Sequence, residues 1–142
     1  MKSLNALLPT LLLFTFAPDL NVAQEVAHEA QPLTLNQPLE SDLHPGEIHA
    51  YTLDVEAGTF VFGEVDQLSI DVVVKVLGAD GAQLAEFDSP ARGPEPFSFS
   101  SEQAGVYRLS VRPFLEDESG RYAAHVLQTE PVATSPEGRR GP

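Results

Sequence analysis

Two segments of the chain carry the same five-residue pattern, Tyr-x-Leu-x-Val, at positions 51–55 and 107–111. In both, large apolar residues alternate with polar ones, which is the period of a β-strand with one face buried and the other in water. Ala57-Gly58 follows the first segment and Ala104-Gly105 precedes the second, so each has a turn signal beside it. The pattern predicts two core strands and constrains the fold more than the function.

Short apolar segments separated by turn residues continue along the rest of the chain. Residues 59–66 and 97–100 alternate, and 71–77 is rich in valine, which favours a strand covered on both faces. Asp80-Gly81 fits a tight hairpin turn, and Gly63 indicates a bulge or a close backbone approach. We therefore predict an all-β fold, an antiparallel β-sandwich of jelly-roll type with eight or nine short strands and little helix.

Apolar residues of three predicted strands should form the core: Tyr51, Leu53, Val55, Val72, Val74, Val76, Tyr107, Leu109 and Val111. The aromatic rings on strands are expected there too, because the chain has no tryptophan for an exposed sugar-binding face. They include Phe60, Phe62, Phe87, Phe97 and Phe99.

Residues 89–96 hold three prolines and a glycine, and are predicted to form a loop.

The start of the chain has the composition of an export signal. Lys2 precedes an apolar run from Leu4 to Phe16, and small residues end near Ala23. This run is shorter than the ~20 residues needed to cross a bilayer as a helix. We therefore predict a signal peptide over 1–23, a flexible lead-in over 24–31, a β-sandwich domain over 32–129 and a disordered tail over 130–142. The expected location is secreted or periplasmic.

The charge and the cysteine content exclude several functions. The net charge is −13, which disfavours nucleic acid and anionic membrane surfaces and favours cations or basic proteins. There is no cysteine, so disulfides, thiol chemistry and a lipidated N-terminus are excluded. We expect a monomer without stable membrane insertion, whose partner is a secreted protein or an extracellular polymer.

The order of landmarks along the chain resembles that of a known family. It runs from Pro45-Gly46-Glu47-Ile48 through the Asp80-Gly81 turn to the Tyr107 strand and Gly120-Arg121-Tyr122. This order is similar to that of the bacterial pre-peptidase C-terminal domain family. The resemblance implies a small β-sandwich that accompanies secreted hydrolases and is not itself catalytic. Some relatives bind calcium or extracellular polymers. No catalytic domain follows in this chain, so we expect a free-standing module or a detached part of a larger architecture.

Acidic residues provide the candidate ligand site. Asp66, Asp71 and Asp88 lie at predicted strand ends on either side of the valine-rich strand and would meet at one edge of the sandwich. Calcium prefers such carboxylate oxygens on loops, so these three residues are the candidate metal ligands. The alternative is that the aspartates cap turns through their short acceptor side chains. No other cofactor is expected.

Enzyme motifs give no support for catalysis. His44 and His49 flank Glu47, but without the helix and spacing of a His-Glu-x-x-His zinc site, and the four histidines are expected to be dispersed on the surface. There is no Gly-x-Ser-x-Gly nucleophile motif. We therefore predict a secreted, non-catalytic accessory or binding module. The alternative is a calcium-stabilised domain that binds an extracellular polymer or protein, and a small hydrolase is the least favoured reading.

Overall fold

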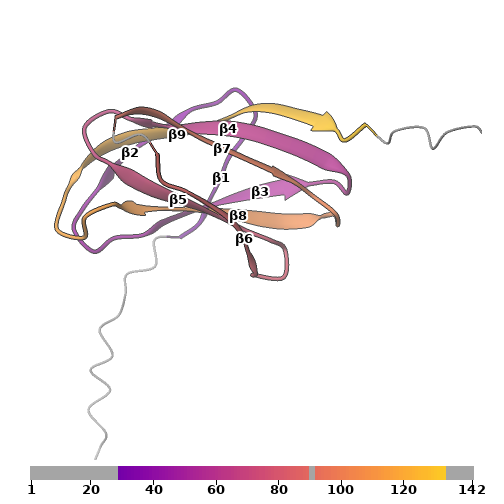
Figure 1. Cartoon of the computed structure of the whole chain (residues 1–142), viewed down its shortest axis with the longest axis horizontal. Coiled ribbons are helices and arrows are strands. Elements are labelled where there is room, and N and C mark those ends of the chain that lie inside the picture. The colour runs from indigo at the N-terminus through magenta and orange to yellow at the C-terminus, as the bar shows by residue number, and fades with distance from the viewer. Residues whose placement is uncertain (1–28, 90–91, 134–142) are drawn as a thin grey trace, which may run out of the picture.

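The computed structural model describes residues 29–89 and 92–133 and shows two packed β-sheets (Figure 1). The described part contains nine strands and no helix, which confirms the predicted all-β sandwich. The strands are β1 (Gln31–Pro32), β2 (Leu39–Leu43), β3 (His49–Val55), β4 (Thr59–Gln67), β5 (Val72–Leu77), β6 (Gln83–Phe87), β7 (Gly93–Ser100), β8 (Gly105–Pro113) and β9 (Gly120–Pro131). The predicted signal peptide lies outside the described residues.

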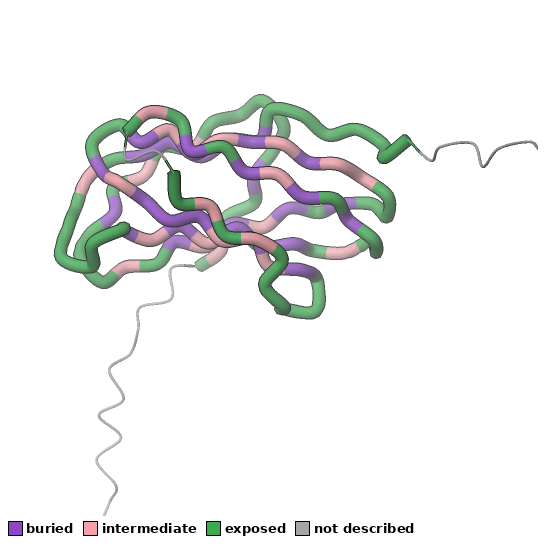
Figure 2. Tube along the Cα trace, in the orientation of Figure 1, coloured by how far each residue is buried: buried purple, intermediate pink, exposed green. Residues whose placement is uncertain are grey.

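One sheet has five strands in the order β1-β3-β8-β5-β6, and the other has four in the order β2-β9-β4-β7. Neighbouring strands are antiparallel except for β1 and β3, which are parallel. Buried and more exposed residues alternate along most strands (Figure 2). Because successive side chains of a strand point to opposite faces, the buried ones line the space between the two sheets. No described segment is a helix long and apolar enough to cross a bilayer.

The two Tyr-x-Leu-x-Val segments are direct neighbours. They form most of β3 and β8, and in their antiparallel register Tyr51 is opposite Leu109 and Leu53 is opposite Tyr107. Each tyrosine therefore packs beside a leucine of the other copy, as aromatic and aliphatic cross-strand pairs do. All nine predicted core residues are buried, and Leu109 and Val111 are fully inaccessible to solvent.

Two expectations about the four-stranded sheet are wrong. Phe60 and Phe62 alternate with inward-facing residues of β4 and are half-buried, so they lie on the outer face of this sheet rather than in the core. The segment predicted as a loop over 89–96 is already strand from Gly93 onward. Pro94 and Pro96 fit there because β7 is an edge strand, where a missing N–H leaves no ladder bond unmade.

Glycines occupy two positions that the sequence had indicated. Gly63 lies at a register shift between the neighbouring strands β4 and β9. A Cβ there would lie only 2.5 Å from the carbonyl oxygen of His125, so only glycine fits at this position. The hairpin between β5 and β6 turns at Gly81, whose φ is +83°. Both predictions are confirmed.

Three connections are tied together at one end of the sandwich, on the left in Figure 1, which we call the loop end. They are residues 44–48, 68–71 and 114–119. Backbone N–H groups of Gly46, Ser69 and Phe114 donate to the carbonyls of Glu116, Arg121 and Asp71 at 2.9–3.0 Å. The opposite end is formed by residues 56–58, 78–82 and 101–104.

Candidate functional site

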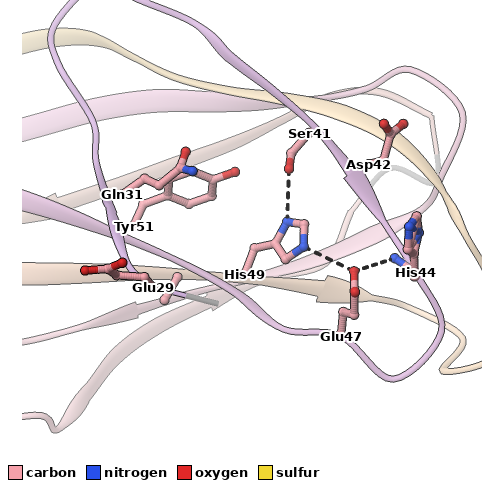
Figure 3. A pocket seen from close by; sticks show the side chains of 9 residues that line it. Glu29, Gln31, Ser41, Asp42, His44, Glu47, His49 and Tyr51 are labelled. Atoms are coloured by element: carbon pink, nitrogen blue, oxygen red, sulfur yellow. Dashed lines mark hydrogen bonds and ion pairs between the residues drawn. The ribbon is translucent and has the colours of Figure 1, made fainter. Parts of the chain in front are cut away.

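A pocket of about 310 Å³ opens beside the loop end, between β2 and β3 (Figure 3). Its walls carry Glu29, Gln31, Ser41, Asp42, His44, Glu47, His49, Ala50 and Tyr51. Three of these side chains are acidic, and none of the described lining residues is a lysine or an arginine. The exposed carboxylate of Asp42 also pairs with Arg121 at 3.6 Å. Glu29 and Glu47 therefore provide most of the negative charge of this acidic pocket.

His49 holds Glu47 in place. Its Nε2 atom lies 3.3 Å from Glu47 Oε2, and the same oxygen accepts a hydrogen bond from the backbone N–H of His44 at 2.9 Å. The other ring nitrogen, Nδ1, lies 2.7 Å from the Tyr122 hydroxyl and 3.3 Å from Ser41 Oγ. If the proton is on Nε2, His49 donates to the carboxylate and accepts from Tyr122, which satisfies both nitrogens. Glu47 is thereby oriented in the pocket wall before any ligand arrives.

Two buried tyrosines extend the hydrogen-bond network of His49 into the core. The hydroxyls of Tyr51 and Tyr122 are 2.6 Å apart, and both rings are almost inaccessible to solvent. Burial raises the pKa of both phenols, and for Tyr122 the neighbouring Tyr51 adds to the effect. Both hydroxyls therefore stay protonated and serve as hydrogen-bond partners in a buried polar cluster of Ser41, His49, Tyr51 and Tyr122.

Ser41, His49 and Glu47 follow the order of a nucleophile, a base and an acid, but the distances do not favour serine catalysis. The Tyr122 hydroxyl is closer to Nδ1 than Ser41 Oγ is, at 2.7 Å against 3.3 Å, and takes the lone pair that would activate the serine. The cluster instead fixes the position of Glu47. This role for His49 was missed, because the four histidines were expected on the surface, whereas His49 is 6% exposed.

Of the three predicted metal ligands, Asp71 and Asp88 lie at strand ends of the same sheet and Asp66 lies on the other. Asp71 directly precedes β5 and Asp88 directly follows the neighbouring β6. These two positions lie at the adjoining ends of the paired strands β5 and β6. Burial raises the pKa of Asp71, and the charge of Asp88 raises it further. Asp66 lies between the inward-facing Val65 and Gln67 of β4, so its side chain is on the outer face of the other sheet.

A third carboxyl joins Asp71 and Asp88 from the four-stranded sheet. Glu95 of β7 is 1% exposed, and its Oε2 accepts a hydrogen bond from the backbone N–H of Ser89 at 2.9 Å. Burial raises its pKa, the Ser89 bond lowers it, and the charges of Asp88 and Asp71 raise it again. Within residues 29–89 and 92–133, no three or more acidic, histidine or cysteine side chains are arranged around a common metal position.

Solved structures of three bacterial proteins share this architecture. The pre-peptidase C-terminal domain of a Bacillus anthracis collagenase superposes with a TM-score of 0.56 and 19% identity, over 69% of this chain and 94% of that one. The fold that the landmark order implied is therefore the fold observed. No family model and no curated protein matches the sequence.

Two periplasmic inhibitors of g-type lysozyme, both called PliG, have a similar fold. The Salmonella Typhimurium protein gives a TM-score of 0.52 at 13% identity, over 73% of this chain and 100% of that one. The Aeromonas hydrophila protein gives 0.50 at 18% identity, over 68% and 95%. At these identities the similarity establishes the fold alone.

Proposed function

We propose that this chain is an exported, non-catalytic β-sandwich that binds a basic protein outside the cytoplasm. The observation that carries the proposal is the acidic pocket, in which Glu47 is held by His49 and by the backbone of His44. The pocket accepts the cationic side chain of a lysine or an arginine from the partner.

Size and preorganisation support this assignment. Pockets for drug-sized ligands span about 300–1,000 Å³, so a pocket of about 310 Å³ fits a single side chain better than a large molecule. Because Glu47 is already oriented, binding a guanidinium or ammonium group loses little side-chain entropy. The net charge of −13 accelerates encounter with a basic partner and disfavours an acidic one.

The comparisons supply the class of partner to test. Two proteins with this fold are described as periplasmic inhibitors of g-type lysozyme, and a third is a domain of a collagenase. The predicted signal peptide over 1–23 would bring this chain to the same compartments. We therefore assign as partner a secreted basic enzyme of the lysozyme type, with the sandwich acting by binding.

The test is a calorimetric titration of the mature chain with a g-type lysozyme chosen for a basic isoelectric point, with cell-wall lysis as a second readout. We expect binding that weakens between about 20 mM and about 200 mM salt, because exposed charges are screened. Glu47→Gln should weaken it by about tenfold or more, as loss of an interfacial charge partner does. Glu102→Gln, at the opposite end of the sandwich, is the matched control. Absence of binding, or equal affinity of the two variants, would refute the proposal.

A second candidate function is calcium-dependent stabilisation, for which the electrostatic repulsion among Asp71, Asp88 and Glu95 is the observation, although these described carboxyls do not surround a common metal position. The charge of Asp88 raises the pKa of Asp71, and the charges of both raise the pKa of Glu95, so these carboxyls repel when ionised and a divalent cation would relieve that repulsion. Thermal melting of the mature chain with calcium and with chelator measures this directly. Calcium should raise the melting temperature of the wild type and leave the Asp71→Asn/Asp88→Asn double variant unchanged. Identical melting of the wild type in both buffers would exclude calcium.

A further inference from the structure

We propose that an apolar surface at the loop end, formed by Leu68, Phe114 and Leu115, is the second half of the interface with the same basic partner. This inference rests on the proposed function. The three side chains are 49%, 45% and 51% exposed. Phe114 and Leu115 line a cleft of about 450 Å³ together with the buried Ile70. Large apolar side chains exposed beside a cleft are typical of interaction sites rather than of ordinary surface.

The loops that present these side chains are held by hydrogen bonds. The N–H of Phe114 donates to the carbonyl of Asp71, and the N–H of Glu118 donates back to Leu115 at 3.0 Å. Ser69, next to Leu68, donates through its N–H to the carbonyl of Arg121 and accepts from the Arg121 N–H through Oγ at 2.7 Å. A surface fixed in this way is preorganised, so a partner that covers it loses little conformational entropy.

The loop that carries Leu115 is hydrogen-bonded to the loop that borders the acidic pocket. Gly46 lies in the short connection between the pocket residues His44 and Glu47, and its N–H donates to the carbonyl of Glu116 at 3.0 Å. Glu116 directly follows Leu115. One partner can therefore place a cationic side chain in the acidic pocket and an apolar side chain in the cleft.

The charges around the cleft identify the occupant as basic. Glu116, Asp117 and Glu118 directly follow Leu115, and Asp71 and Glu118 line the cleft with Arg92 as its one described cation. A second copy of this chain would bring two molecules of net charge −13 together, and an anionic membrane would also be repelled. A basic protein is attracted, so the occupant is an apolar residue flanked by lysine or arginine on that protein.

The experiment measures g-type lysozyme binding by full-length mature variants. Leu115→Ser and Phe114→Ser should each weaken binding by about tenfold or more, as loss of an interface anchor does. Leu84→Ser is the matched control, because Leu84 is 49% exposed but lies at the opposite end of the sandwich. Its affinity should stay within about twofold of the wild type. The exposed triple variant Glu116→Gln/Asp117→Asn/Glu118→Gln should slow association and reduce its salt dependence.

The outcomes separate this inference from the proposed function. If the wild type binds and Glu47→Gln weakens binding, but Leu115→Ser and Phe114→Ser bind like the wild type, the loop-end surface is not part of the interface. If light scattering shows a wild-type dimer that Leu115→Ser dissociates, the occupant is a second copy and the inference is wrong. If the wild type does not bind, the proposed function falls and this inference falls with it.

Discussion

Replacing Tyr122 by phenylalanine removes the central hydroxyl of the buried cluster and leaves the ring in place. That hydroxyl lies 2.7 Å from His49 Nδ1 and 2.6 Å from the Tyr51 hydroxyl, and Tyr122 is fully buried. A buried group that loses its partner costs about 1–3 kcal/mol. Ser41 lies 3.3 Å from His49 Nδ1 and also interacts with both hydroxyls, so the cluster can partly re-form. We therefore expect Tyr122→Phe to lower the free energy of unfolding by about 1–2 kcal/mol.

Chemical denaturation of the mature chain measures this change, with Tyr51→Phe and the double variant completing a mutant cycle. Tyr51→Phe removes a hydroxyl that contacts Tyr122 and Ser41 but not His49, and it should cost about 0.5–1.5 kcal/mol. Because the two hydroxyls contact each other, the cycle should give an interaction energy of at least about 0.5 kcal/mol. A cost for Tyr122→Phe below about 0.3 kcal/mol, or strict additivity of the two changes, would refute the role given to this cluster.

Two further predictions concern the core and the carboxyl edge. Leu109→Ala should cost about 2–5 kcal/mol in unfolding free energy, because Leu109 is fully buried; an unchanged thermal melt would contradict the core assignment. The pKa of Glu95 is raised by burial, so the folded protein binds more protons than the unfolded chain and its stability falls as the pH rises from the unfolded value through the folded one. Glu95→Gln should therefore melt at a higher temperature than the wild type at about pH 7 in chelator, and the difference should shrink toward about pH 4. A lower melting temperature at neutral pH would show that the Ser89 hydrogen bond outweighs the burial of the charge.

Local sequence signals predicted the strands and turns that depend on near neighbours. Backbone and packing needs within a few residues explain three of these features. They are the alternation at Tyr51 and Tyr107, the Asp80-Gly81 turn and the register shift at Gly63. The strand that begins at Gly93 was missed because Pro94 and Pro96 were taken as signs of a loop. Proline opposes a central strand but not an edge strand, and edge position depends on pairing that local sequence does not encode.

The candidate site was less predictable, because distant segments build it. One clue was available: His49 has the same parity as Tyr51 in its strand, so the alternation already placed its ring inward. The partners of that ring were not visible, since Tyr122 lies in the last strand and Ser41 in the second. Glu95 was also missed, because residues 89–96 were predicted as a loop and a loop residue gives no sign of burial. Its carboxyl feels the charges of Asp71 and Asp88.

The strand order has a consequence for how this chain acquires its structure. β8 lies between β3 and β5 in one sheet, and β9 lies between β2 and β4 in the other. Both sheets are thus joined through strands made late in synthesis, so neither sheet is complete until residues 105–131 have emerged. A chain truncated after Ser100 would lack an inner strand of each sheet and would expose the apolar faces of β3, β4 and β5 together. The complete sandwich therefore forms only after residues 105–131 are available.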